Sequence, residues 1–141
     1  MSLRRLLILA ATCLAFGVVA LGAYVRLSDA GLGCPDWPGC YGHLVGVPAQ
    51  AHEQSAAALA FPGKPVETAK AWKEMVHRYF AGALGLSVLA LAVLAWRRRG
   101  EPGQPLSLPL ALLGLIVFQA LLGMWTVTWQ LKPVVVMAHL L

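Results

Sequence analysis

Two histidines lie inside the apolar stretches of the sequence, His77 about nine residues after the expected start of one span at 68 and His139 six residues after the start of another at Pro133. An ionisable side chain in such surroundings is costly to bury and marks a functional site by default. Histidine is a standard axial ligand of heme iron, and apolar walls suit a porphyrin. Two imidazoles at one height on neighbouring helices could therefore hold a heme between them. The competing interpretation is that each histidine only hydrogen-bonds a neighbouring helix.

A carboxylate and a guanidinium flank the first of these histidines. Glu74 precedes His77 by about one helical turn, so the two side chains share a helix face. The carboxylate could orient a substrate or relay protons, or it could form an ion pair with Lys70, Lys73 or Arg78. Arg78 suits a heme propionate or a lipid phosphate equally well. Glu74 is therefore the candidate catalytic residue, and Arg78 joins the two histidines as a candidate cofactor-binding residue.

Cys34 and Cys40 lie in a stretch rich in glycine and proline, whose turns can bring two Cα atoms within the ~7 Å that a disulfide allows. Two interpretations compete: a structural disulfide that staples a loop with little core, and a redox-active pair. The spacing differs from the Cys-x-x-Cys of thioredoxin-like motifs, and two cysteines alone make a poor metal site. Cys13, in the first apolar stretch, is most simply a packing residue.

The composition places these residues on helices within a membrane. The chain is 59% hydrophobic and 12% charged, whereas about a quarter of the residues of a soluble domain are charged. The predicted fold is an all-α integral membrane protein, a four-helix transmembrane bundle with three complete spans and the start of a fourth. The predicted spans are about 6–25, 68–96, 106–131 and 133–141. Because the last one covers less than half a bilayer, we expect a piece of a longer protein.

The distribution of charge predicts the orientation. Arginines precede the first span at positions 4 and 5 and follow the second at 97–99, while the loop 26–67 with its flanks is balanced, with a short helix expected around 51–60. Basic residues favour the cytoplasmic side, which predicts a multi-pass protein of the inner (plasma) membrane with a cytoplasmic N-terminus and a periplasmic loop 26–67. Since the basic clusters flank apolar runs, the net charge of +5 indicates contact with membrane lipid and no nucleic-acid binding.

Three motifs resemble those of the heme A synthase family. They are GAYVRLSDAGLGCPDWP at 22–38, EMVHR at 74–78 and QALLGMWTV at 119–127. They occur in family order and, with their surroundings, cover most of the chain outside 44–66. The resemblance implies an eight-helix protein made of two similar four-helix halves. This chain would then be the N-terminal half, with the missing C-terminal half or a second copy of itself as its partner.

The same resemblance implies an activity, namely oxidation of the methyl group of heme O to the formyl group of heme A by successive hydroxylations, with heme B as cofactor. By resemblance, His77 and His139 match the family's N-terminal pair of heme-iron ligands. Glu74 matches the glutamate that precedes this pair, and Cys34 and Cys40 match loop cysteines thought to form a disulfide. Heme O is then the substrate, and heme O synthase and an electron donor are expected partners.

Two other functions stay open. A non-catalytic membrane heme-binding or electron-transfer module would need both histidines but could dispense with Glu74. A membrane thiol oxidoreductase would use Cys34 and Cys40, with the histidines incidental. Alkylation with and without reductant would separate the second from the others, because a catalytic pair cycles and a staple stays closed.

Overall fold

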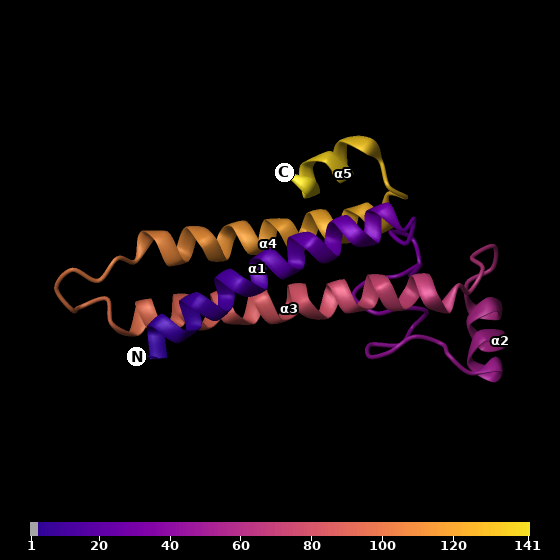
Figure 1. Cartoon of the computed structure of the whole chain (residues 1–141), viewed down its shortest axis with the longest axis horizontal. Helices are drawn as coiled ribbons and strands as arrows, with labels where there is room; N and C mark the ends of the chain where they lie inside the picture. The colour runs from indigo at the N-terminus through magenta and orange to yellow at the C-terminus, as the bar shows by residue number, and fades with distance from the viewer. Residues whose placement is uncertain (1–2) are drawn as a thin grey trace.

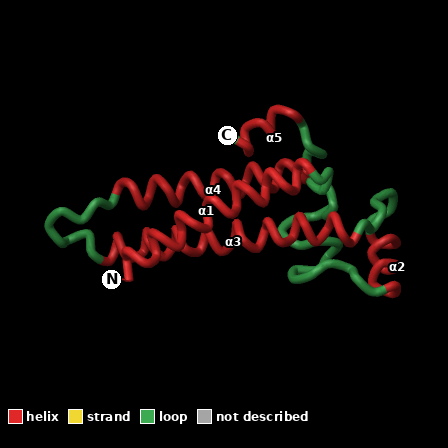
Figure 2. The backbone as a smooth tube through the Cα atoms, viewed as in Figure 1, coloured by secondary structure: helices red, strands yellow, loops and turns green. Residues whose placement is uncertain are grey.

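The protein is an elongated helical bundle, seen here in a computed structural model that describes residues 3–141 (Figures 1 and 2). Within these residues there is no strand, and an isolated bridge pairs Cys40 with His43. The predicted all-α fold is thereby confirmed. Its helices are α1 (Leu3–Leu27), α2 (Ala51–Ala60), α3 (Thr68–Arg97), α4 (Ser107–Thr128) and α5 (Pro133–Leu140).

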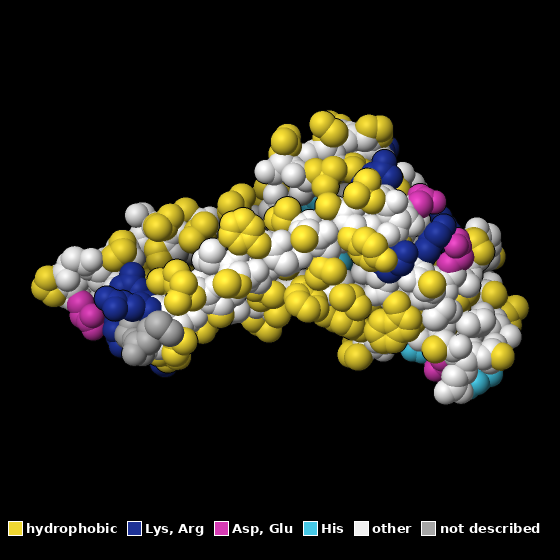
Figure 3. Space-filling view, viewed as in Figure 1, with side chains coloured by type: hydrophobic (Ala, Val, Ile, Leu, Met, Phe, Trp, Pro, Cys, Tyr) yellow, Lys and Arg dark blue, Asp and Glu magenta, His cyan; other side chains and the backbone are white. Residues whose placement is uncertain are grey.

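Three of these helices are long and apolar enough to cross a membrane. The most apolar windows of α1, α3 and α4 have mean hydropathies of 2.5, 2.0 and 2.1, and only 6%, 17% and 11% of their residues are buried inside the molecule. Most of the apolar side chains therefore face outward, where lipid must replace water. Figure 3 shows the same pattern, with hydrophobic side chains along the shaft and charged ones gathered at its two ends. The chain is an integral membrane protein.

Helix α3 packs against both α1 and α4. Helix α5 folds back along α4, so that α5 and α3 run in the same direction (Figure 1). Within residues 3–141, α5 packs against no other helix. The two histidines thus lie on co-directional helices that are separated by α4, which runs the opposite way.

The ends of the helices follow local backbone chemistry. Helix α3 begins at Thr68 and α5 begins at Pro133, where the missing proline N–H costs no hydrogen bond. Helix α4 ends at Thr128, before the expected end at position 131, because Gln130 and Leu131 adopt left-handed φ values of 51° and 55°. That turn reverses the chain and sends α5 back along α4.

A cluster of buried residues lies where the 28–67 loop meets the first turns of α3. There the loop, α2 and α3 together form a small core, onto which Phe61 and Val66 also pack. The core residues are Cys34, Cys40, Tyr41, Val47, Ala57, Ala71 and Met75.

At the opposite end of the bundle, Arg4 donates a hydrogen bond to Gln104, 3.1 Å away, and joins the start of α1 to the α3–α4 turn.

Candidate functional site

The imidazole of His77 lies directly against the backbone of α1. A methyl group placed on Gly22 would lie 3.1 Å from Cε1 of His77, closer than side chains normally approach. The carbonyl of Val18, one helical turn before Gly22, lies near the imidazole. The ring is half-buried and held by one helix face.

His139 on α5 has the same surroundings, provided by α4. A methyl group on Gly123 would lie 3.3 Å from Cε1 of His139. The nearby carbonyl is that of Gln119, again one turn before the glycine. Gln119 is the first residue of the 119–127 motif, and it is the backbone of this residue that lies near the imidazole.

Each of the two imidazoles has one ring nitrogen without a hydrogen-bond partner. Among the described residues, Nδ1 of His77 and Nδ1 of His139 are the buried side-chain polar atoms that lack a hydrogen-bond partner. An unsatisfied polar atom costs free energy in an apolar interior, and it calls for an explanation such as a missing ligand. The same unusual feature therefore occurs in both histidines that the sequence selected.

These two residues fit a heme better than a bare metal ion. Residues 3–141 contain no group of three or more His, Cys, Asp or Glu side chains that could hold an ion. A porphyrin brings four nitrogen ligands of its own, so the protein needs to supply only axial ligands, for which histidine is standard. A metal-bound histidine commonly donates its other ring N–H to a backbone carbonyl, and Val18 and Gln119 offer such carbonyls.

Glu74 is buried, with 5% of its surface exposed, and both of its carboxylate oxygens have partners. Oε2 accepts the backbone N–H of Cys34 at 3.0 Å, and Oε1 pairs with Nη2 of Arg78 at 2.5 Å. Of the three ion pairs that the sequence allowed for Glu74, the structure has the one with Arg78. Lys70 instead pairs with Glu67, 3.1 Å away.

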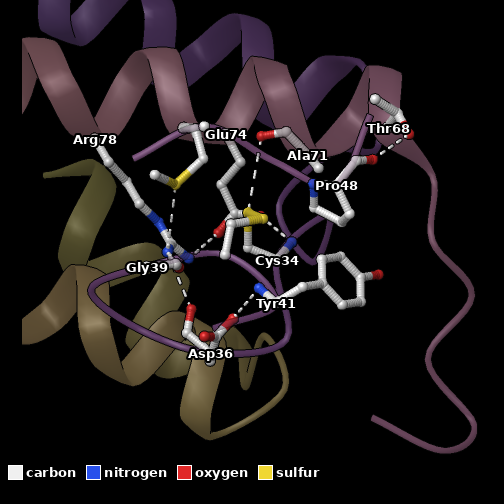
Figure 4. Close-up of a disulfide and its surroundings, with 12 residues drawn as sticks. Cys34, Asp36, Gly39, Tyr41, Pro48, Thr68, Ala71, Glu74 and Arg78 are labelled. Atoms are coloured by element: carbon white, nitrogen blue, oxygen red, sulfur yellow. Dashed lines mark hydrogen bonds and ion pairs between the residues drawn. A yellow bond between two sulfur atoms is a disulfide. The ribbon is translucent and has the colours of Figure 1, made fainter. Parts of the chain in front are cut away.

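Arg78 completes a clamp on the disulfide loop (Figure 4). Its Nη1 donates to the carbonyls of Asp36, Pro38 and Gly39, while Nη2 pairs with Glu74. The pair of charges on α3 thus satisfies backbone groups of Cys34 and of the turn between the two cysteines. In this conformation the guanidinium is directed into the loop.

Cys34 and Cys40 form a disulfide, as expected. Both cysteines are fully buried, in the core that the loop shares with α3. A redox-active disulfide has to be reached by an attacking thiolate, and its reduced form by an oxidant, so this burial favours the structural interpretation. Cys13 is a free cysteine, exposed on α1.

Two residues of the loop contribute more than the sequence analysis foresaw. A methyl group on Gly33 would lie 2.6 Å from the backbone carbon of Lys70, so only glycine lets the loop lie this close to α3. The carboxylate of Asp36 accepts the N–H of Tyr41 at 2.6 Å and the N–H of Gly42 at 2.8 Å. Both residues lie within the 22–38 motif, which was the signal available.

Tyr41 closes the loop onto the segment before α3. Its hydroxyl donates to the carbonyl of Pro65 at 2.7 Å, and its ring packs edge-on against Phe61 at 5.6 Å. Burial raises the pKa of the Tyr41 hydroxyl, and the nearby carboxylates of Glu67 and Asp36 raise it further. The hydroxyl therefore stays protonated and remains a donor.

Several known proteins are similar to this chain. The profile of the family described as cytochrome oxidase assembly protein matches residues 4–141. A heme A synthase of Shewanella oneidensis is 58% identical over 88% of this chain and 36% of its own length. Heme A synthases of Caulobacter vibrioides and Staphylococcus saprophyticus are 36% and 30% identical over 75% and 98% of this chain, and over 29% and 40% of their own lengths. No solved structure matches the chain.

The fold and the site define a multi-spanning helical membrane protein that presents two histidines on co-directional helices next to a disulfide-bonded loop. With the family profile matched over residues 4–141, the chain belongs to the heme A synthase family of cytochrome oxidase assembly proteins. It spans about a third of the length of the curated relatives it matches.

Proposed function

We propose that this chain is the N-terminal heme-binding half of a heme A synthase, which oxidises the methyl group of heme O to the formyl group of heme A. The observation that carries the proposal is the pair His77 and His139. Both rings are backed by glycine, and each has a buried Nδ1 without a hydrogen-bond partner. The names of the similar proteins support the assignment to heme A synthesis.

In this proposal His77 and His139 hold the heme iron from α3 and α5. Heme B, when bound to the complete protein, supplies the oxidising chemistry, and heme O is the substrate. The carbonyls of Val18 and Gln119 orient the two imidazoles, as backbone acceptors do for metal-bound histidines. The apolar walls of the helices keep water away from the rings.

We assign Glu74 to the reaction as the carboxylate nearest along the helix to His77. Its oxygens hold the N–H of Cys34 and the guanidinium of Arg78, so the carboxylate first orders the disulfide loop. To accept a proton from a substrate, Oε1 has to release Arg78. A role of Arg78 toward a heme propionate likewise requires that the guanidinium leave a loop carbonyl.

The proposed location is the inner membrane, with the N-terminus in the cytoplasm and the loop 26–67 in the periplasm. The disulfide lies in that loop, and disulfides persist in oxidising compartments. The arginines at 4, 5 and 97–99 lie at the opposite end of the bundle, as the preference of basic residues for the cytoplasmic side requires. The rest of the protein or a second copy, heme O synthase, an electron donor and membrane lipid are the proposed partners.

Histidine variants test the proposal in the complete protein. His77→Ala and His139→Ala each remove one axial ligand, and we expect the low-spin heme absorbance of this half to be lost in both. His52→Ala is the matched control, because His52 is exposed on α2. Wild-type spectra in both His77→Ala and His139→Ala would end the heme assignment.

The same preparations test the role of Glu74. Glu74→Gln keeps the size and one hydrogen-bond acceptor of the side chain but removes its charge and its capacity as a base. We expect heme to stay bound while the production of heme A stops. Normal heme A output from Glu74→Gln would leave this residue with its structural role alone.

A further inference from the structure

We propose that Gly22 and Gly123 are positioning residues that fix the orientation of the His77 and His139 imidazoles. Each glycine, with the carbonyl one turn before it, forms a seat on which one ring lies. The purpose of this arrangement rests on the proposed heme function, but the contacts between the glycines and the rings are present in the protein alone.

The first argument is the closeness of the rings to the glycines. Cε1 of His77 lies 3.1 Å, and Cε1 of His139 lies 3.3 Å, from where a Cβ would be. Both nitrogens of His77 would lie 3.6 Å from that Cβ, so the ring approaches Gly22 through the edge between its nitrogens. A side chain at either glycine would push its ring away by a few tenths of an ångström.

The second argument is that the seat occurs twice. Val18 lies four residues before Gly22, and Gln119 lies four residues before Gly123, so each carbonyl and its glycine share one helix face. Helix α1 provides the glycine and carbonyl beside His77 of α3, and α4 provides those beside His139 of α5. The sequence repeats the pattern weakly, as Leu-Gly-x-Tyr at 21–24 and Leu-Gly-x-Trp at 122–125. Two helices of different sequence thus share the same arrangement of a glycine and a preceding carbonyl beside a histidine ring.

The third argument separates these glycines from the other glycines of the long helices. Small residues often serve only to bring membrane helices together. Methyl groups on those other glycines would meet no atom of the described chain within 4 Å, apart from their own helix. The two glycines that face another side chain each face a histidine. The glycines without such contacts are Gly17, Gly82, Gly85 and Gly114.

The test compares Gly22→Ala and Gly123→Ala with Gly17→Ala and Gly114→Ala, which lie on the same two helices. All four changes raise helix propensity by about the same amount, ~1 kcal/mol per residue, so that effect cancels in the comparison. Each chain is reconstituted in lipid nanodiscs and titrated with hemin, and the electron paramagnetic resonance spectrum of the bound low-spin heme is recorded. That spectrum depends on the mutual orientation of the two imidazole planes, which a purely structural glycine would not change.

We expect Gly22→Ala and Gly123→Ala to shift the low-spin signal and to weaken hemin binding about tenfold, as is usual when the orientation of a metal ligand is disturbed. Gly17→Ala and Gly114→Ala should match the wild type. Signals identical to those of the controls would overturn the proposal. Loss of folding in Gly22→Ala and Gly123→Ala alone would also overturn it, because the glycines would then serve packing.

A second measurement separates this inference from the heme assignment. Histidine ¹⁵N chemical shifts of the chain without hemin report the hydrogen bonding and tautomer of each ring. We expect the His77 signals to move in Gly22→Ala and the His139 signals to move in Gly123→Ala, each without change at the other ring. If the wild type bound no hemin but these shifts occurred, the heme function would be refuted, while the positioning role of Gly22 and Gly123 would be supported. Unmoved histidine signals would refute the positioning role, whether or not hemin binds.

Discussion

At the scale of single residues, Glu74 and Arg78 show how a charged pair can be stable at the edge of a membrane. Their side chains are 6% and 12% exposed, and each charge has hydrogen-bond partners besides the other. A buried charge is tolerated when it is paired and its remaining donors and acceptors are satisfied. The loop carbonyls and the Cys34 N–H meet this condition.

Arg78→Ala should therefore destabilise the protein strongly. The change leaves the Glu74 carboxylate buried without its counter-charge and removes the donor of three loop carbonyls, which should cost about 3–5 kcal/mol. Thermal unfolding in detergent measures the loss. Arg98→Ala is the control, because its ion pair with Glu101 is exposed and spans 4.0 Å, and the expected change is below about 0.5 kcal/mol. Equal midpoints for the two variants would contradict the clamp.

At the scale of the elements, the sequence predicted the helices better than their contacts. The lengths of the apolar runs gave the spans, and Pro133 marked the start of α5. The imidazole of His77 lies against Gly22, which is far away in the sequence. The spacing of residues along one helix cannot predict a contact of this kind. The clamp was missed for the same reason, since helical periodicity pairs Glu74 with Arg78 but does not say which loop lies beside them.

Helix α2 contains a pH-sensitive N-terminus. Glu53 accepts the N–H groups of Gln50 and Ala49 at 2.9 Å each, and these bonds lower the pKa of its carboxyl group below the ordinary 4.5. Since the folded pKa is the lower one, the stabilisation is present above 4.5 and is lost as the pH falls through the lowered folded value. We therefore expect the first turn of α2 to loosen on acidification.

Amide chemical shifts of Ala49 and Gln50 during an acid titration measure this effect. The expected midpoint lies below 4.5, and Glu53→Gln should abolish the transition. A midpoint at or above 4.5, or a transition that persists in Glu53→Gln, would show that these hydrogen bonds do not govern the helix start.

At the scale of the whole molecule, the two ends of the bundle differ in chemistry. One end holds the disulfide core, and the other holds the arginine-rich turn, with the apolar shaft between them (Figure 3). This polarity is what the proposed orientation in the membrane requires.

Labelling of single cysteines tests that orientation. In a Cys13→Ala background, Ser55→Cys places a thiol on exposed α2 and Glu101→Cys places one in the exposed turn at the other end. With a membrane-impermeant maleimide, we expect Ser55→Cys to react on intact cells and Glu101→Cys to react only after the membrane is opened. The reverse pattern would invert the proposed topology.

Helix α5 is attached to the described bundle through α4 alone. Any group gripped at once by His77 and His139 would act as a brace between the α1–α3 pair and the α4–α5 pair. Binding of such a ligand would then stabilise the helical bundle, and the unfolding midpoint would rise with the concentration of the ligand.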